Sequence, residues 1–151
     1  MSHSQTDLFE EILGPPFGNI KRGIKGINRS EWRGWGMDSP NKRRIGSRYE
    51  RMAAEYLKKQ GVVILEQNYQ ARQGEIDLIG MDKDYLIFVE VKYRKNAESG
   101  APAEAVTLWK QRHIRMTAQY YLYSRRYGDI PCRFDVVCIL DQEIQWIQDA
   151  F

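Results

Sequence analysis

Residues Gly74–Arg94 read GEIDLIGMDKDYLIFVEVKYR and decide the fold, because they describe two strands joined by a tight turn. The second strand, Tyr85–Arg94, is rich in valine, isoleucine, phenylalanine and tyrosine, which favour extended structure. Its odd-numbered positions are all apolar, whereas its even-numbered positions begin apolar and end in Glu90, Lys92 and Arg94. Since side chains alternate across a strand, we expect one buried face and one face that ends in charge.

The turn decides which charged side chains face one another. If it is centred on Lys83–Asp84, antiparallel pairing places Asp77 opposite Glu90. The same register places Glu75 opposite Lys92, where it would hold the lysine in place or form a simple cross-strand ion pair. Directly opposed carboxylates have Cβ atoms about 4.5–5.5 Å apart and destabilise a sheet. Protonation of one carboxylate, or a divalent cation with a lysine beside it, would relieve the repulsion.

These residues resemble a known signature. Asp77, followed by Glu90-Val91-Lys92, is similar to the PD-(D/E)xK nuclease motif, with Ile76 where the superfamily places proline. The longer pattern GEIDLI…FVEVK, with GSRYERMAAEYL before it and GAPAEAV after it, resembles the YraN-like family of uncharacterised bacterial proteins over roughly residues 46–140. The resemblance implies the restriction-endonuclease-like fold, an α/β three-layer sandwich with helices flanking a mixed central sheet of about five strands.

The resemblance also implies an activity, namely metal-dependent hydrolysis of phosphodiester bonds in DNA with Mg²⁺ or Mn²⁺ as the cofactor. Asp77, Glu90 and the backbone carbonyl of Val91 would supply the metal's oxygen ligands. Lys92 would orient the attacking water or pair with phosphate oxygens. Glu50, in the first helix, would complete or orient the metal site, with a surface ion pair as its alternative role. Analogy with Holliday-junction resolvases of the same fold suggests branched or structured DNA.

Basic residues outside the signature are expected to contact the nucleic acid. They are Lys110, Arg94, Arg43, Arg44 and Arg48. A solvated helix start is the alternative for the three arginines that precede Tyr49, and an ammonium group that reaches water from an apolar stripe is the alternative for the lysine. The net charge of +3 permits a polyanionic partner without requiring one.

The remaining pattern predicts further elements around the central hairpin. Apolar residues at spacings of three and four predict two helices, over residues 46–60 and about 103–124. Apolar runs predict three more strands, over residues 62–66, 133–140 and 143–148. Residues 68–74 are expected to form a polar connection between the first strand and the hairpin.

The sequence predicts two regions, a folded domain and an extension that precedes it. Residues 42–151 are predicted to form the nuclease-like domain. Residues 1–41 are predicted to form an N-terminal extension that is disordered or loosely packed, because no apolar period continues through it. A misassigned translation start is one alternative, and stacking of its aromatic residues on bases, or their docking on the domain, is another.

Composition also limits which other classes of protein the sequence fits. Cys132 and Cys138 lack the spacing of a zinc site, and we expect reduced, buried thiols in a cytoplasmic protein. No apolar run approaches a membrane span, and no signal-peptide core is present. The sequence leaves a homodimer open. A non-catalytic nucleic-acid-binding module on the same scaffold is the alternative to a nuclease, and a protein-interaction role through the extension is a third reading.

Overall fold

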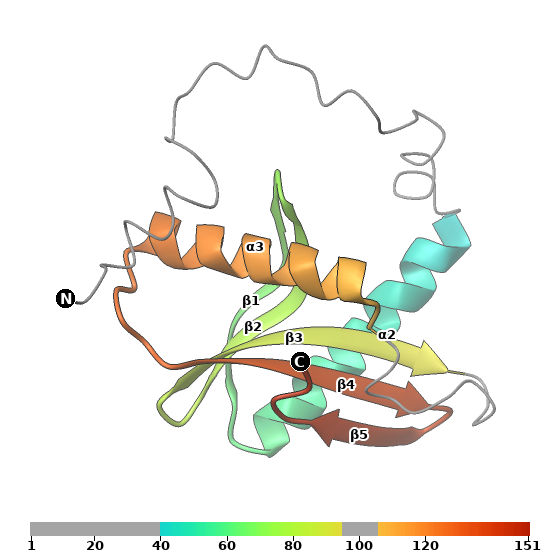
Figure 1. The fold of residues 1–151 in the computed structure, drawn as a ribbon. Helices are drawn as coiled ribbons and strands as arrows, with labels where there is room; N and C mark the ends of the chain where they lie inside the picture. Colours follow the sequence, from blue (N-terminus) through green and yellow to red (C-terminus); the bar gives the residue numbers. More distant parts are fainter. Residues whose placement is uncertain (1–39, 95–105) are drawn as a thin grey trace, which may run out of the picture. The chain divides into compact units, whose positions relative to one another are not determined.

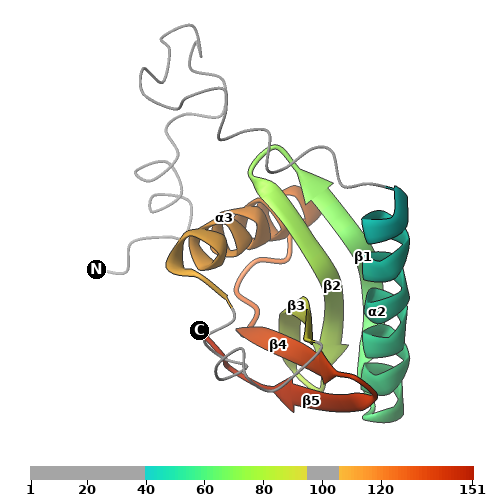
Figure 2. The same ribbon diagram turned by 90° about the vertical axis from the view of Figure 1, so that its right-hand side faces the viewer.

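Five strands form one mixed sheet, and two helices cover its two faces (Figure 1 and Figure 2). The computed structural model describes residues 40–94 and 106–151, and the side chains from residue 44 onward. The elements in chain order are α2 (Pro40–Lys59), β1 (Val63–Ala71), β2 (Gly74–Asp82), β3 (Tyr85–Arg94), α3 (Leu108–Arg125), β4 (Cys132–Leu140) and β5 (Glu143–Ile147). The predicted α/β three-layer sandwich is confirmed.

The strands lie in the order β1-β2-β3-β4-β5, and β3 and β4 are the parallel pair. Parallel neighbours require a crossover connection, and α3 provides it. In the β2–β3 hairpin, Leu78 pairs with Val89 and Ile79 pairs with Phe88, which is the register predicted from the turn. Lys83 adopts a left-handed backbone conformation in that turn, with φ of 54°.

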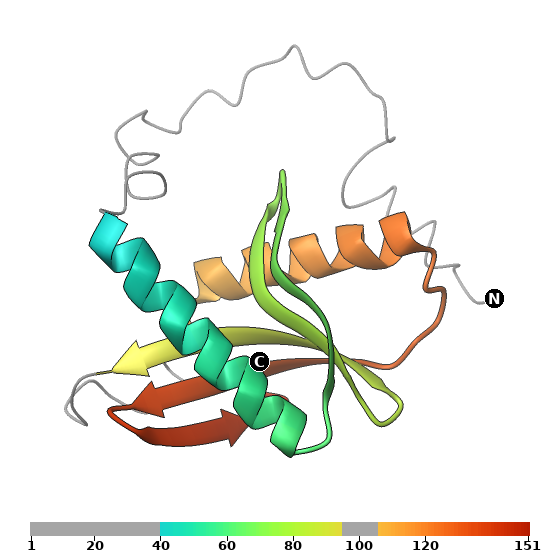
Figure 3. The same cartoon turned by 180° about the vertical axis from the view of Figure 1, so that it is seen from behind.

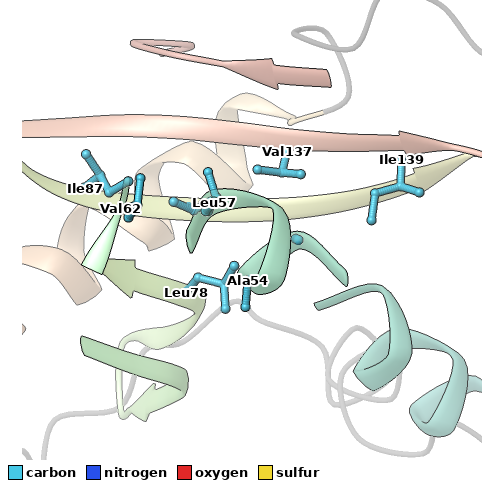
Figure 4. Packing of buried hydrophobic residues seen from close by; sticks show 9 residues of the cluster. Ala54, Leu57, Val62, Leu78, Ile87, Val137 and Ile139 are labelled. Carbon is cyan, nitrogen blue, oxygen red and sulfur yellow. The ribbon is translucent and has the colours of Figure 1, made fainter. Parts of the chain in front are cut away.

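The helix α2 packs on one face of the sheet, across which it runs diagonally (Figure 3). Its residues Ala53, Ala54 and Leu57 are buried against apolar side chains of β2, β3 and β4. Figure 4 shows this cluster, in which Leu78 and Ile87 come from the central hairpin. Apolar residues three and four apart on one helix face drive this packing, as the sequence pattern predicts.

The helix α3 covers the opposite face. Ile114, Ala118 and Tyr121 are buried there with Phe88 of β3 and Val136 of β4. Both faces of β3 are therefore buried along most of its length, and only its C-terminal end keeps the charged character that alternation predicts. Within the described ranges, neither helix is long and apolar enough to cross a lipid bilayer.

Two element boundaries differ from the sequence prediction because of local helix chemistry. The first helix begins at Pro40 instead of residue 46, and proline suits the first turn because it lacks the N–H that would have no partner there. The helix α3 begins at Leu108 instead of residue 103, because the Thr107 side chain caps it by accepting a hydrogen bond from the Lys110 N–H. Residues 1–39, which contain most of the predicted extension, lie outside the described residues.

A third boundary differs because of tertiary contacts. The strand β1 continues to Ala71 through the segment predicted as a polar connection. Its polar residues pair with β2, and the Tyr69 ring meets the Tyr121 ring of α3 edge to face at 5.0 Å between centroids. Backbone pairing and this aromatic contact favour a strand where composition alone indicates a loop. The predicted bounds of the other strands agree with the structure to within a residue or two.

A buried charge network joins β2, β4 and β5, from Asp82 beside the start of β3 to Asp135, which lies level with Val89. The fully buried Asp135 accepts hydrogen bonds of 2.8–3.0 Å from the Arg133 guanidinium, the Trp146 indole N–H and the Asp149 backbone N–H. Arg133 also donates to Asp82 at 2.7 Å. These bonds satisfy a charge that would otherwise destabilise the core.

Gly80 is required by the close approach of β1 to β2. A Cβ atom at this position would lie 2.9 Å from the Val63 carbonyl oxygen, which cannot rotate aside as a flexible side chain would. We expect Gly80→Ala to lower the free energy of unfolding by about 1–3 kcal/mol, measured by urea denaturation. Gly46→Ala is the control, because its Cβ would make only an ordinary contact in α2 and alanine favours helix. Unchanged stability of the Gly80 variant would contradict this packing.

Candidate functional site

The strands β2 and β3 stop pairing beyond Leu78 and Val89. At this point the Asp77 side chain accepts a hydrogen bond of 2.7 Å from the Val91 backbone N–H. The carboxylate therefore occupies the position that a ladder carbonyl would take, and it is held against β3. The structure thus brings Asp77 beside Glu90, its partner in the predicted register.

Glu90 is the most buried carboxylate of the site, with 4% of its surface exposed. Its Oε1 atom pairs with the Lys92 Nζ atom at 3.0 Å, and its Oε2 atom lies 3.6 Å from the Lys110 Nζ atom of α3. Among the described residues, Oε2 is buried and accepts no hydrogen bond. A buried carboxylate oxygen without a donor is costly, so this oxygen is well suited to a further cation.

The pKa of Asp77 shows the effect of placing several carboxylates close together in this site. Burial and the negative charge of Glu90 raise the pKa of Asp77 well above its usual value of 3.8, and Glu50 acts in the same direction. The Val91 N–H and the Lys110 ammonium group oppose this rise in the pKa of Asp77. The folded protein therefore holds the proton of this carboxyl group more tightly than water-exposed surroundings would, and a cation beside it would oppose that effect.

Glu50 joins the same electrostatic cluster from α2. Burial raises the pKa of Glu50, the charges of Glu75 and Glu90 raise it further, and a hydrogen bond from the Asn68 side chain lowers it. The cluster thus contains four carboxylates and two ammonium groups: Glu50, Glu75, Asp77, Glu90, Lys92 and Lys110. Negative charge is in excess if all of them ionise, which is the condition that a divalent cation would relieve.

The other predicted residues lie at different distances from this cluster. The structure brings Lys110 into it, with the side chain 19% exposed, so the alternative of an ammonium group directed wholly to water is not observed. Glu75 lies 4.0 Å from Lys110 and does not pair with Lys92 as predicted, because β2 has separated from β3 there. Arg94 ends β3, beyond Lys92.

The predicted arginine run lies on α2. Arg44 and Arg48 are exposed on its N-terminal half, before Glu50. The side chain of Arg43 lies outside the described residues. Nothing in the geometry links these arginines to the carboxylates, so a contact with nucleic acid stays a prediction for them.

The carboxylates of the cluster are candidate ligands for a metal ion. No three His, Cys, Asp or Glu side chains of residues 44–94 and 106–151 are grouped closely enough to hold one together. The Asp77–Glu90 pair nevertheless fits a magnesium ion, which binds through one or two carboxylates and keeps several waters. The donor-free Oε2 atom of Glu90 and the raised pKa of Asp77 both favour a cation at this pair. The predicted ligand Val91 presents its N–H to Asp77, and its carbonyl lies on the same side of the strand.

Asn68 is a site residue that the sequence analysis missed. Gln67 pairs with Leu78 and Tyr69 pairs with Ile76, so Asn68 lies across from Asp77 on β1. Its φ of 53° is left-handed in the middle of a strand, where asparagine is tolerated better than most residues. An asparagine within a run of strand residues is the available signal, but the polar composition of this segment favours a connection instead.

The model of the uncharacterised protein family UPF0102 matches residues 49–139, which is more than half of the chain. The chain belongs to this family. The predicted resemblance to the YraN-like family is thereby confirmed. The matched UPF0102 span includes all the residues of the electrostatic cluster, and it excludes the three arginines at the start of α2.

Relatives from several bacteria match most of the chain. A UPF0102 protein of Lachnoclostridium phytofermentans is 52% identical over 112 residues, which cover 74% of this chain and 95% of the relative. A UPF0102 protein of Vibrio parahaemolyticus is 48% identical over 113 residues, covering 73% and 93%. A UPF0102 protein of Shewanella oneidensis is 45% identical over 107 residues, covering 71% and 98%.

The raised pKa of Asp77 predicts a pH-dependent stability. Ionisation of a group whose pKa is raised on folding works against the folded state, and the loss grows as pH rises through the folded pKa. In EDTA we therefore expect Asp77→Asn, which keeps an acceptor for the Val91 N–H, to melt at a higher temperature than the wild type at neutral pH. The difference should vanish as the pH falls to about 4.

The exposed Asp129 provides the control for this measurement, because Asp129→Asn removes a carboxylate outside the cluster. Its melting temperature should follow that of the wild type at every pH. An Asp77→Asn variant that is less stable than the wild type at neutral pH in EDTA would show that the ionised carboxylate is favoured in the folded state, against this account.

The hydrogen bond from the Asn68 side chain to Glu50 predicts a second effect, on the pKa of Glu50. Asn68→Gly removes the amide but accepts the left-handed backbone, whereas Asn68→Ala also adds about 1 kcal/mol of strain. Both variants should raise the pKa of Glu50, followed by carboxyl carbon NMR, and the alanine variant should be the less stable one. If Glu50 titrates identically in Asn68→Gly and in the wild type, Asn68 does not act on this carboxylate.

Proposed function

We propose that this protein is a metal-dependent nuclease that hydrolyses phosphodiester bonds in DNA. One observation carries the proposal, namely the buried Glu90 carboxylate, whose Oε2 atom has no hydrogen-bond donor among the described residues, beside Asp77 and two lysines. Two carboxylates that share a buried site with two ammonium groups form a centre that can hold both a cation and a phosphate. The resemblance to the PD-(D/E)xK motif supports the same reading.

Asp77 and Glu90 would hold Mg²⁺ or Mn²⁺, with the Val91 carbonyl as a further oxygen ligand. Oxygen donors of this kind suit these hard ions. Such an ion, when bound, acidifies a water molecule and neutralises negative charge on the phosphate. The Val91 N–H fixes one oxygen of Asp77 at 2.7 Å, which orients the carboxylate before anything binds.

The two lysines would act on the phosphate and on the attacking water. Lys92 is 29% exposed and is held at 3.0 Å from Glu90, so its ammonium group has a fixed position and still reaches solvent. It would donate hydrogen bonds to the phosphate oxygens or hold the water in line. Lys110 would add a second positive charge where negative charge develops, which lowers the barrier most in a site with little water.

Glu50 would act from α2 on the water or on the metal's outer shell. Burial and its neighbours raise its pKa, which moves the carboxyl group toward the range in which it can accept and return a proton. No third carboxylate joins the Asp77–Glu90 pair among residues 44–94 and 106–151, so an orienting role fits Glu50 better than direct ligation.

A non-catalytic nucleic-acid-binding module is the second candidate. The observation that favours it is the same lack of a three-carboxylate group in the described part of the chain. Branched or structured DNA remains the proposed substrate by analogy of fold alone.

The proposal is tested with a panel of duplex, single-stranded and branched DNA and of RNA in Mn²⁺ or Mg²⁺. Metal-dependent cleavage is expected, and Lys92→Ala should reduce its rate about 10²–10³-fold, since one charged donor to the reacting group is lost. Asp77→Ala should reduce it at least as much, and both variants should still bind the nucleic acid.

Matched controls come from the exposed Glu55–Lys58 pair on α2, whose charged atoms lie 2.9 Å apart. Glu55→Ala and Lys58→Ala remove the same charges away from the cluster and should cleave at the wild-type rate. Cleavage that persists in Asp77→Ala would refute the proposed site. Binding without cleavage of any substrate by the wild type, insensitive to metal, would favour the non-catalytic module.

A further inference from the structure

The helix α3 has an unusual charge composition. From Leu108 through its C-terminal cap Arg126 it contains no acidic residue, whereas it contains Lys110, Arg112, Arg115, Arg125 and Arg126. Surface helices of soluble proteins commonly mix the two signs of charge, which stabilises them through pairs three or four residues apart. Lys110 and Arg125 pair with Glu90 and Glu66 of the sheet, so the positive field of the helix that attracts polyanions comes mainly from Arg112, Arg115 and Arg126.

The outward face of this helix is aromatic. At 3.6 residues per turn, Trp109, Arg112, Met116, Tyr120 and Tyr123 lie on the side opposite the buried Ile114, Thr117, Ala118 and Tyr121. Trp109, Tyr120 and Tyr123 are 53%, 38% and 53% exposed. We call Trp109, Arg112, Tyr120 and Tyr123 the outer stripe of α3.

Large exposed rings on one face usually mark a binding surface. The Trp109 ring is also held in place, because it packs on the His113 ring with centroids 3.8 Å apart. A ring that is already fixed loses little conformational freedom when a flat ligand stacks on it. Arg112 is exposed beside these rings, where a guanidinium group can reach a phosphate.

The outer stripe begins next to the electrostatic cluster. Trp109 immediately precedes Lys110, whose ammonium group lies 3.6 Å from Glu90 on the sheet side of the helix. From Trp109 to Tyr123 the helix rises about 21 Å at 1.5 Å per residue. A strand of a few nucleotides laid along the stripe would therefore have one end close to the two site carboxylates.

We infer that the outer stripe of α3 binds an unpaired nucleic-acid strand, with bases stacked on Trp109, Tyr120 and Tyr123 and a phosphate on Arg112. The inference rests on the proposed function, and it adds the class of substrate: nucleic acid with a single-stranded segment next to the bond that is cut. Three rings with an arginine among them suit this ligand, because every base has a face that can stack and every nucleotide carries a negative charge. Paired bases in a duplex expose no such faces.

The test measures binding in EDTA, so that cleavage does not interfere. Fluorescence anisotropy is followed with a 15-nucleotide oligo-dT, an oligo-U of the same length, a blunt DNA duplex and poly-glutamate. Trp109→Ala and Tyr120→Ala should each weaken binding to the single strands about 5- to 150-fold, and should change the weaker binding to the duplex little. Tyr120→Phe keeps the ring and should bind as the wild type does.

Two further variants separate stacking from charge. Arg112→Ala should lower the slope of log affinity against log salt by about 0.7, while the ring variants should keep the wild-type slope. Tyr85→Ala is the matched control, because Tyr85 is another exposed tyrosine, at 45%, outside α3. It should bind the single strands as the wild type does. Melting temperatures confirm that each variant is folded.

The outcomes are distinguishable from those of the nuclease test. Wild-type affinity in the ring variants overturns the inference, as does equal loss of affinity for the duplex, or poly-glutamate binding as tight as that of oligo-dT. None of these results touches the effect of Asp77→Ala or Lys92→Ala on cleavage. Conversely, ring-dependent binding in a protein that cleaves nothing would support the stripe and refute the nuclease.

Discussion

A carboxylate buried beneath a helix is the constraint on which the site depends. The negative charge of Glu90 is compensated by Lys92 on its own strand and by Lys110 on α3. A buried charge costs several kcal/mol unless partners compensate it, so α3 must keep its place over β3 for the folded state to tolerate this carboxylate. The apolar contacts of α3 and this charge pairing therefore favour one and the same position of the helix.

The topology explains why these partners meet. Because β3 and β4 are parallel, the chain has to cross over one face of the sheet, and α3 does so, packing on Leu86 and Phe88 of β3 and reaching Glu90 with Lys110. Glu50 approaches the same end of β3 from α2 on the opposite face. Asp135 lies level with Val89, next to Glu90, so by strand alternation the fully satisfied Asp135 and the incompletely satisfied Glu90 project from opposite faces of the sheet.

The sequence predicts the hairpin well and its surroundings less well. The alternation in β3 and the position of the turn were enough to place Asp77 opposite Glu90, because strand register has a period of two. The role of Lys110 could not be decided from spacing, since a lysine on an apolar stripe can turn to water or to a buried carboxylate. Only the packing of α3 on the sheet distinguishes the two.

Two other differences between the sequence prediction and the structure have a common cause. Glu75 was expected beside Lys92, but the ladder ends before it, and the freed end of β2 moves toward α3. Asn68 was expected in a connection, but β1 continues past it with one left-handed residue. Both depend on where a ladder ends or bends, and that is decided by contacts between segments far apart in the sequence.

The most direct measurement is anomalous X-ray scattering from crystals grown in Mn²⁺. The account predicts a manganese peak bound by Asp77 and Glu90, with the Oε2 atom of Glu90 as one of its ligands. If saturating Mn²⁺ gave no peak there while Lys92 and Lys110 kept their contacts with Glu90, the two lysines would suffice for the buried charge. That result would contradict the claim that this site is built to hold a metal ion.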